Sequence, residues 1–237
     1  MSEQALEQVG EGLGGMWGKW IECGVPAGAR ELFSAGQGAW AVIRDQPGLV
    51  GQVGGWDAAT GRAHVLGLWR DEEAYGRFME DRHDEVFAGS GQEGGYTAIE
   101  TAAGAAVLEM AGDAADLAQA LDGATLLRVA DCLVVPGREG RFMAVQREVW
   151  APGMAAAGGM LAGVVTRLGE QRYLVTTLWS GPEAHERYTT AHLPALLARA
   201  GLEEDLRSTT GHLIPLEPRW RVLPVAAPAC GGVPPGE

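Results

Sequence analysis

The sequence predicts an α+β protein that contains two copies of one β-α-β-β-α-β unit. Two observations carry this prediction: residue types recur at a nearly constant spacing, and strand-like and helix-like patterns follow the same order in both halves. A chain of 237 residues is long enough for one large domain or two small ones. Two repeats of this size are too few and too large for a solenoid, so we interpret them as two copies of one small domain.

The repeat is visible as matching residues that lie 109 or 110 positions apart, a regularity that is hard to obtain by chance. The matching pairs are Cys23 and Cys132, Gly28 and Gly137, Phe33 and Phe142, Trp40 and Trp150, Leu68-Trp69 and Leu178-Trp179, Glu73-Ala74 and Glu183-Ala184, and Arg77 and Arg187. Phe78 corresponds to Tyr188, and His83 corresponds to His192 if one residue is dropped within the helix.

In the first copy, alternation, helical spacing and turn residues predict each element in order. Residues 16–25 alternate and end at a proline, which indicates a strand. Residues 27–43 are alanine-rich, with large apolar residues near helical spacing, and predict a helix. The apolar runs 48–56 and 62–69 predict a hairpin. Residues 71–87 begin with acidic residues, which favour a helix start, and 95–100 predict the closing strand.

The second copy repeats this order, with strands at 125–135, 159–168, 171–179 and 210–217 and helices from about residue 137 and at 180–200. Pro182 lies in the first turn of the last helix, and Pro194 should bend it. The order in each copy is that of a ferredoxin-like unit. We therefore expect five segments: an N-terminal extension (1–15), the first ferredoxin-like copy (16–101), an Ala/Gly-rich linker (102–124) with a short helix at 113–121, the second ferredoxin-like copy (125–217) and a Pro/Gly-rich tail (218–237).

Composition and charge limit the classes of protein to which the chain can belong. The formal net charge of −13 argues against a nucleic-acid partner, because such proteins need a basic surface. We expect no membrane association, since no apolar run is long enough to span a bilayer and the N-terminus lacks the features of a signal peptide. The three cysteines are far apart and form no CxxC pair, which favours a reducing cytoplasm over a disulfide framework.

The hairpin and second helix of the first copy, with the stretch "FMEDRHDEVF", resemble the dimeric α+β barrel superfamily, which includes the antibiotic-biosynthesis monooxygenases. The first copy is most similar to small bacterial members of uncharacterised function. The likeness covers residues 16–101 and, more weakly, 125–217. In this superfamily two single-domain chains pair their sheets, so the resemblance implies a pseudo-dimeric barrel within one chain, and hence a monomer. It also implies a ligand cavity between each sheet and its helices.

Two histidines are the candidate catalytic residues. His83 follows Tyr75 and Met79 at helical spacing, and His192 follows Tyr188 in the same way. Each histidine is therefore expected to face its own sheet, where the resemblance places the cavity. A neutral imidazole there could transfer a proton near neutral pH. The alternative is that both histidines are structural, because a cation near a helix C-terminus is favourable.

The candidates for substrate binding are Trp69, Trp179, Tyr75, Tyr188, Arg77 and Arg187. The resemblance implies a tryptophan beside a polycyclic aromatic substrate, and an indole stacks well on flat rings. Arginines could hold an anionic group by paired hydrogen bonds. The alternatives are core packing for the tryptophans and a solvated helix face for the arginines. Because the copies differ along the helix stripe, we expect the more open and polar pocket in the second copy, around His192, Tyr188 and Trp179.

The sequence predicts no metal site and no cofactor, since it contains no tight ligand motif and no GxGxxG that opens a helix. Haem stays open, because a single histidine can be an axial ligand. The main hypothesis is a small-molecule enzyme that oxygenates an aromatic metabolite without a cofactor, with the substrate carbanion reducing oxygen. A ligand-binding or stress-related protein without turnover explains the same pocket with fewer assumptions. A cyclase or isomerase could use the same groups.

Overall fold

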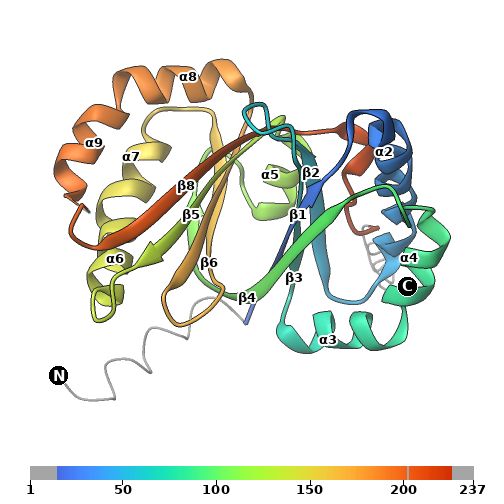
Figure 1. Cartoon of the computed structure of the whole chain (residues 1–237). Helices are drawn as coiled ribbons and strands as arrows, with labels where there is room; N and C mark the ends of the chain where they lie inside the picture. Colours follow the sequence, from blue (N-terminus) through green and yellow to red (C-terminus); the bar gives the residue numbers. More distant parts are fainter. Residues whose placement is uncertain (1–14, 202, 226–237) are drawn as a thin grey trace, which may run out of the picture.

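Eight antiparallel strands form a continuous sheet at the centre of the molecule (Figure 1). The computed structural model describes residues 15–201 and 203–225. The strands follow the order β2-β3-β1-β4-β6-β7-β5-β8 across the sheet. The helices α2 to α4 of the first half and α6 to α9 of the second half lie on opposite sides of these strands (Figure 1).

Each half contributes four strands and the helices that connect them. The first half contains β1 (Trp17–Gly24), α2 (Arg30–Ala39), β2 (Leu49–Trp56), β3 (Ala63–Trp69), α3 (Glu72–Asp81), α4 (His83–Ser90) and β4 (Ala98–Ala111). The second half contains α5 (Leu117–Gly123), β5 (Leu126–Val134), α6 (Glu139–Val145), α7 (Ala151–Ala155), β6 (Met160–Arg167), β7 (Arg172–Trp179), α8 (Pro182–Ala191), α9 (Leu193–Ala200) and β8 (Leu206–Pro215). A π-helical turn (Gln146–Trp150) joins α6 to α7. The predicted fold class, two tandem ferredoxin-like β-α-β-β-α-β units, is confirmed.

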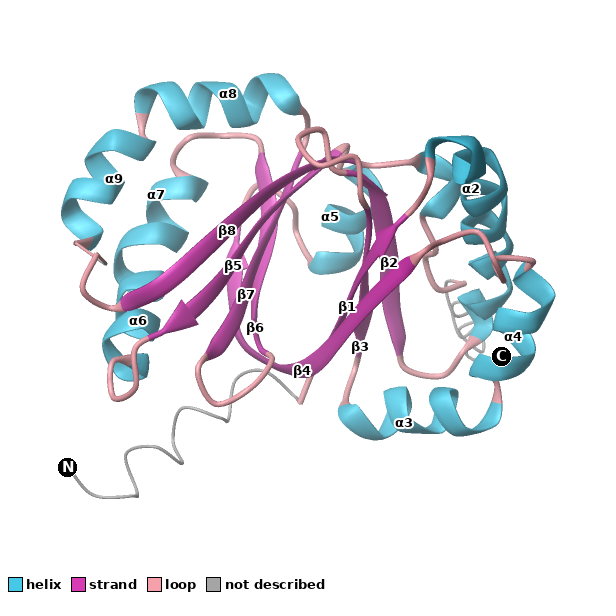
Figure 2. Ribbon diagram, in the orientation of Figure 1, coloured by secondary structure: helices cyan, strands magenta, loops and turns pink. Residues whose placement is uncertain are grey.

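The two units join along two unequal seams. At the first seam β4 and β6 form an antiparallel ladder that runs from Ala105 to Ala111 on β4. At the second seam β2 and the chain that follows β8 are joined by two isolated bridges, Gly55 with Leu216 and Gln52 with Val222. The strands therefore curve into a barrel that is firmly closed on one side and loosely closed on the other (Figure 2).

The inner faces of the two units form one core inside this barrel. Trp20 and Leu66 of the first unit belong to the same buried cluster as Leu127 and Leu174 of the second unit. α5 adds the fully buried Leu121. β3 is buried at every position, because one face meets the other unit and the opposite face meets the helices.

Two sequence-based expectations about boundaries are corrected. The predicted linker 102–124 is largely structured: its first part extends β4 to Ala111, and only the expected short helix follows, as α5. Small residues suit this stretch because the neighbouring chain lies very close, and a Cβ on Gly104 would collide with the carbonyl oxygen of Arg167. The helix predicted over 71–87 is divided at Arg82 into two helices, α3 and α4. The helix predicted over 180–200 is divided in the same way at His192, two residues before Pro194.

The start of the predicted tail is part of the folded molecule. Trp220 is fully buried against Phe33 and Trp56, and its indole Nε1 donates a hydrogen bond to Ser34 Oγ at 2.9 Å. Val222 pairs with β2 through an isolated bridge. The rest of the tail, 226–237, and positions 1–14 of the N-terminal extension lie outside the described residues. No helix among the described residues is long and apolar enough to cross a membrane.

We expect Trp220→Ala to lower the free energy of unfolding by about 3–5 kcal/mol, because it removes a large buried side chain from between the tail and the first unit. Chemical denaturation of the full chain would measure this. Val225→Ala is the matched control, since Val225 is 64% exposed and its truncation should change stability by less than about 0.5 kcal/mol. A loss below about 1 kcal/mol for Trp220→Ala would show that this segment is not part of the cooperative fold.

Candidate functional site

Each unit contains a cavity between the outer face of its sheet and its helices. Cavity 1, in the first unit, has a volume of about 460 Å³, and cavity 2, in the second unit, about 530 Å³. Both volumes fall in the range of small-molecule sites, and both walls are mainly apolar. The two cavities are therefore the first places to search for function.

The two cavities share a set of polar lining residues at equivalent positions of the repeat. A cation lines each cavity from the first strand of its unit, Lys19 on β1 and Arg128 on β5. A buried glutamine lines each cavity from the first helix segment, Gln37 and Gln146. The offset between the halves changes from 109 to 110 within the π-helical turn, because such a turn accommodates one extra residue. The repeat therefore extends from the fold to the cavity walls.

Cavity 1 has aromatic walls. Its lining includes Phe33, Trp40, Trp69, Tyr75, Phe78, Phe87 and Tyr96. Trp69 stacks on Phe78 with 4.9 Å between ring centroids, and Tyr75 meets the Trp69 ring edge-on at 6.1 Å. Such a surface is suited to a flat, apolar ligand. The structure thus places the predicted residues Trp69 and Tyr75 together in one cavity.

Lys19 is a lining residue that sequence reasoning missed. Its Nζ lies 3.7 Å from Met79 Sδ and 5.6 Å from the centre of the Tyr75 ring. Burial lowers the pKa of the Lys19 ammonium, because the charged form loses hydration. The signal was present in the sequence: Lys19 is the one charged residue on the alternate β1 positions that otherwise carry Trp17, Ile21 and Cys23.

Gln52 adds a second polar group to the wall of cavity 1. It lies on β2, and its buried Nε2 has no hydrogen-bond partner among the described residues. Together, Lys19 and Gln52 present donors into an apolar space. A ligand with an acceptor or anionic oxygen would satisfy both.

His83 also lines cavity 1. It is the first residue of α4, and its ring lies 5.7 Å from that of Trp40 and 6.0 Å from that of Phe78. Its Nδ1 lies 3.0 Å from Oδ1 of the exposed Asp84, which can fix the orientation of the imidazole. The structure therefore brings together three predicted residues, His83, Trp69 and Tyr75.

The proposed equivalence of His83 and His192 is wrong. α4 and α9 begin at His83 and Leu193, so Leu193 takes the place of His83 and lines cavity 2. His192 takes the place of Arg82, at the break between the helices. It lines a shallow depression of the surface, together with the exposed Arg187. The two helices start at an offset of 110, so no residue is missing between them and the two histidines are not equivalent.

The structure also separates the residues of the pocket expected around His192, Tyr188 and Trp179. Trp179 and Tyr188 are fully buried and pack with His185, outside the lining of cavity 2. The predicted residues of the second unit are thus divided between its core and its surface. In the first unit, Arg77 points to solvent and pairs with Glu73. Neither Arg77 nor Arg187 lines a cavity of its unit.

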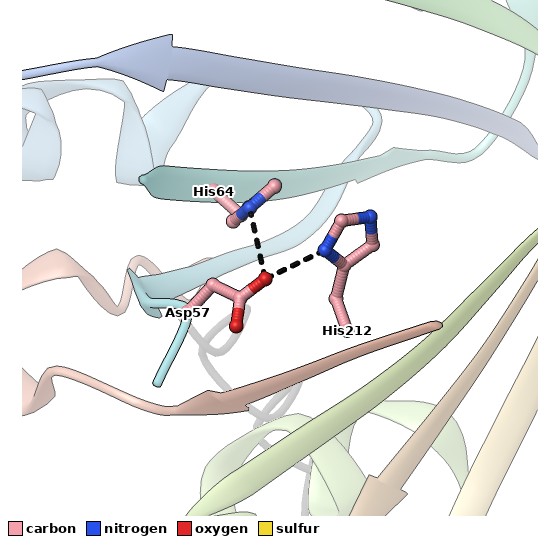
Figure 3. A group of neighbouring side chains, drawn as sticks. All are labelled: Asp57, His64 and His212. Atoms are coloured by element: carbon pink, nitrogen blue, oxygen red, sulfur yellow. Dashed lines mark hydrogen bonds and ion pairs between the residues drawn. The ribbon is translucent and has the colours of Figure 1, made fainter. Parts of the chain in front are cut away.

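A third group of polar residues lies inside the barrel, at the loosely closed seam (Figure 3). It consists of Asp57 after β2, His64 on β3 and His212 on β8, all buried. His212 Nδ1 lies 2.6 Å from Asp57 Oδ2, and His64 Nε2 lies 3.8 Å from the same oxygen. No spacing in the sequence suggested this cluster, because its members come from three separate segments.

Burial, followed by the charge on His212, lowers the pKa of His64 to about 4, although Asp57 opposes the shift. Burial alone would raise the pKa of Asp57. The hydrogen bonds that it accepts from His212, from the Ala59 amide and from Thr60 outweigh this effect and hold the pKa below its usual range. At neutral pH the cluster therefore contains a neutral imidazole and an ionised carboxylate.

The buried His185 gives a prediction for stability against pH. Burial, and then the charge of Arg128, lower its pKa from 6.5 to about 4, so the unfolded chain binds a proton that the folded chain does not. Stability should therefore fall as the pH decreases from 6.5 to 4. We expect His185→Gln to reduce this fall by about 3 kcal/mol, measured by urea denaturation across this range. An unchanged pH profile would show that His185 is protonated in the folded state.

Comparison with solved structures shows that the architecture recurs in other proteins. A protein from Lactobacillus acidophilus NCFM superposes with a TM-score of 0.66 at 12% identity, over 88% of this chain and 96% of the other. A protein from Fusobacterium nucleatum superposes with a TM-score of 0.68 at 8% identity, over 85% of this chain and 92% of the other. Each is described as a "putative monooxygenase". At these identities the likeness shows the ferredoxin-like α+β barrel fold alone.

The sequence comparisons concern the unit that contains cavity 1. Residues 18–103 match the family described as "Domain of unknown function (DUF4937)". The "Uncharacterized protein YdbC" of Bacillus subtilis (strain 168) is 31% identical over 81 residues, which are 33% of this chain and 68% of the relative. Through its first unit, the chain therefore belongs to the DUF4937 family.

Proposed function

We propose that cavity 1 binds a small aromatic metabolite with an acidic oxygen and that the chain oxygenates it without a cofactor. The observation that carries the proposal is Lys19, a half-buried cation in an aromatic cavity, whose Nζ lies against the Met79 thioether and the Tyr75 ring. A charge that has lost part of its hydration without gaining a counter-charge is unfavourable. An anionic ligand oxygen would supply that counter-charge.

The catalytic part of the proposal rests on His83. His83 would take a proton from a methylene between aromatic rings, and the resulting carbanion would be stabilised as an enolate beside Lys19. The carbanion gives one electron to O₂, and the two radicals combine to a hydroperoxide that takes up the proton. Loss of water then leaves a carbonyl, so that one methylene and one O₂ become one carbonyl and one water. The fold shared with proteins described as monooxygenases is compatible with this reaction.

The test is oxygen uptake by the full chain with a dihydroxyanthrone as the probe. We expect His83→Ala to lower kcat about 100-fold with little change in binding, because it removes the base. Lys19→Met should weaken binding of the probe at least about tenfold, because it removes a charged hydrogen-bond donor. Fluorescence quenching of the cavity tryptophans would report binding separately from turnover.

The second unit supplies matched controls. Arg128→Met removes the equivalent cation from cavity 2, and His192→Ala removes the surface histidine, so neither should change oxygen uptake if cavity 1 is the site. Equal losses for Arg128→Met and Lys19→Met would contradict the assignment to cavity 1.

A ligand-binding protein without turnover is the second candidate. Cavity 2 favours it, because this cavity repeats the cation and the glutamine but has Leu193 where cavity 1 has His83. A cavity of this kind can bind a ligand but has no imidazole to move a proton. Probe binding without oxygen uptake would support this candidate, and turnover without oxygen uptake would support a cyclase or isomerase.

We also propose that the chain is a monomer, because the two units already cover each other's inner sheet faces. The large apolar side chains that remain exposed among the described residues come from separate elements, such as Leu32 on α2, Leu197 on α9 and Leu213 on β8. Light scattering should give the mass of one chain, and a tight dimer would contradict the proposal.

A further inference from the structure

The cluster of Asp57, His64 and His212 is more polar than its place in the fold requires. The repeat provides the comparison, because the second unit has an equivalent position at the other seam. The ladder β5–β7 places Leu174 opposite Asp131, as β1–β3 places His64 opposite Glu22. By the same registers Ala102 is the counterpart of His212, and Leu168 that of Asp57.

The counterpart site is therefore built from two leucines and an alanine, and it lies next to the end of the β4–β6 ladder that closes this side of the barrel. Burying two imidazoles and a carboxylate in the equivalent place costs stability. The hydrogen bond between Asp57 and His212 offsets part of this cost. It does not account for His64, whose side chain is fully buried and whose Nδ1 and Nε2 have no hydrogen-bond partner among the described residues.

We propose that Asp57, His64 and His212 bind one divalent transition-metal ion of the zinc or ferrous class. One atom from each side chain lies within 4.8 Å of the others, and Figure 3 shows a nitrogen of each histidine ring lying toward the same oxygen of Asp57. Ligand atoms around a tetrahedral ion at about 2.0–2.1 Å lie about 3.3 Å apart. The separations of 2.6 and 3.8 Å to Asp57 Oδ2 lie on either side of this value, so small side-chain movements would seat an ion.

The chemistry of the ligands selects the class of ion. Two imidazoles and one carboxylate are typical of zinc and non-haem iron sites, whereas calcium and magnesium prefer oxygen ligands alone. Asp57 Oδ1 already accepts a hydrogen bond from the Ala59 amide at 2.8 Å, which orients the carboxylate and directs Oδ2 to the ion. A set of three protein ligands leaves a coordination position for water.

Glu22 provides the outer support that metal-bound histidines normally have. Its Oε2 lies 3.9 Å from His64 Nδ1, so it can accept that N–H when Nε2 binds the ion. Arg62 pairs with Glu22 and holds it in place. Glu22 also lines a cleft of about 210 Å³ with Trp20, Glu100 and Arg172, and the Trp20 ring stacks on that of His64 with 5.0 Å between ring centroids.

The test uses the full chain, stripped of metal with a chelator and titrated with Zn²⁺ alone and with Fe²⁺ alone under anaerobic conditions. We expect one equivalent per chain with a Kd at or below about 1 µM. An excess of ion of about 100-fold over Kd should raise Tm by about 5 °C or more. Binding weaker than about 10 µM for both ions would overturn the proposal.

Two variants and one control locate the site. His64→Leu places at this position the residue that the second unit carries, and it should abolish uptake while it keeps the fold. Asp57→Asn keeps the size of the side chain and one oxygen to accept from the Ala59 amide, and it should weaken binding at least 100-fold, so it decides the question if His64→Leu fails to fold. His192→Ala, at the surface, should bind as the unchanged chain does. Stoichiometric uptake by folded His64→Leu or Asp57→Asn would overturn the proposal.

This inference does not depend on the function proposed for cavity 1. His64 and cavity 1 lie on opposite faces of β3, and the readouts are metal content and stability. Metal binding without oxygenation, or oxygenation without metal binding, would therefore separate the two proposals.

Discussion

The structure depends on the need to cover the second face of a four-stranded sheet. In each unit the helices protect one face, and the opposite face is as apolar as the first. The other unit covers it, so that Trp20, Leu66, Leu127 and Leu174 share one core. This arrangement moves the ligand-sized spaces outward, between sheet and helices, and leaves the barrel interior for side chains. Cavities and barrel core are thus two consequences of one constraint.

The duplication lets each unit serve as the reference for the other. Features that both units share, such as Lys19 with Arg128 and Gln37 with Gln146, belong to what the two cavities have in common. Features found in one unit alone mark specialisation. Cavity 1 contains His83 as a candidate base, whereas cavity 2 has Leu193 at the equivalent position. One seam contains the polar cluster and is a candidate ion site, whereas the other seam carries leucines at the equivalent positions. Both copies lie in the same chain, fold and solvent, so a difference between equivalent positions reflects the residues at those positions.

Much of the fold could be predicted from the sequence, because strands and helices leave periodic signals and the repeat doubled them. The cavity residues Trp69, Tyr75 and His83 were predicted for the same reason, since they follow one helix and the strand before it. The residue equivalent to His83 in the second unit could not be predicted, because α4 and α9 can be aligned only once the residue at which each helix begins is known. The cluster at the seam could not be predicted, since Asp57, His64 and His212 meet only when the barrel closes.

The two seams explain why a polar cluster can persist inside an apolar barrel. The ladder between β4 and β6 closes one side with backbone hydrogen bonds, whereas the other side relies on two isolated bridges, the buried tail around Trp220 and the Asp57–His212 hydrogen bond. An ion held there would bind only the closed barrel, so its occupancy and the closure of this seam would be thermodynamically linked. β3 connects this seam to cavity 1, because His64 faces the barrel and Val65 lines the cavity. Both the candidate ion site and the wall of cavity 1 therefore depend on the position of β3, although neither site needs the other to form.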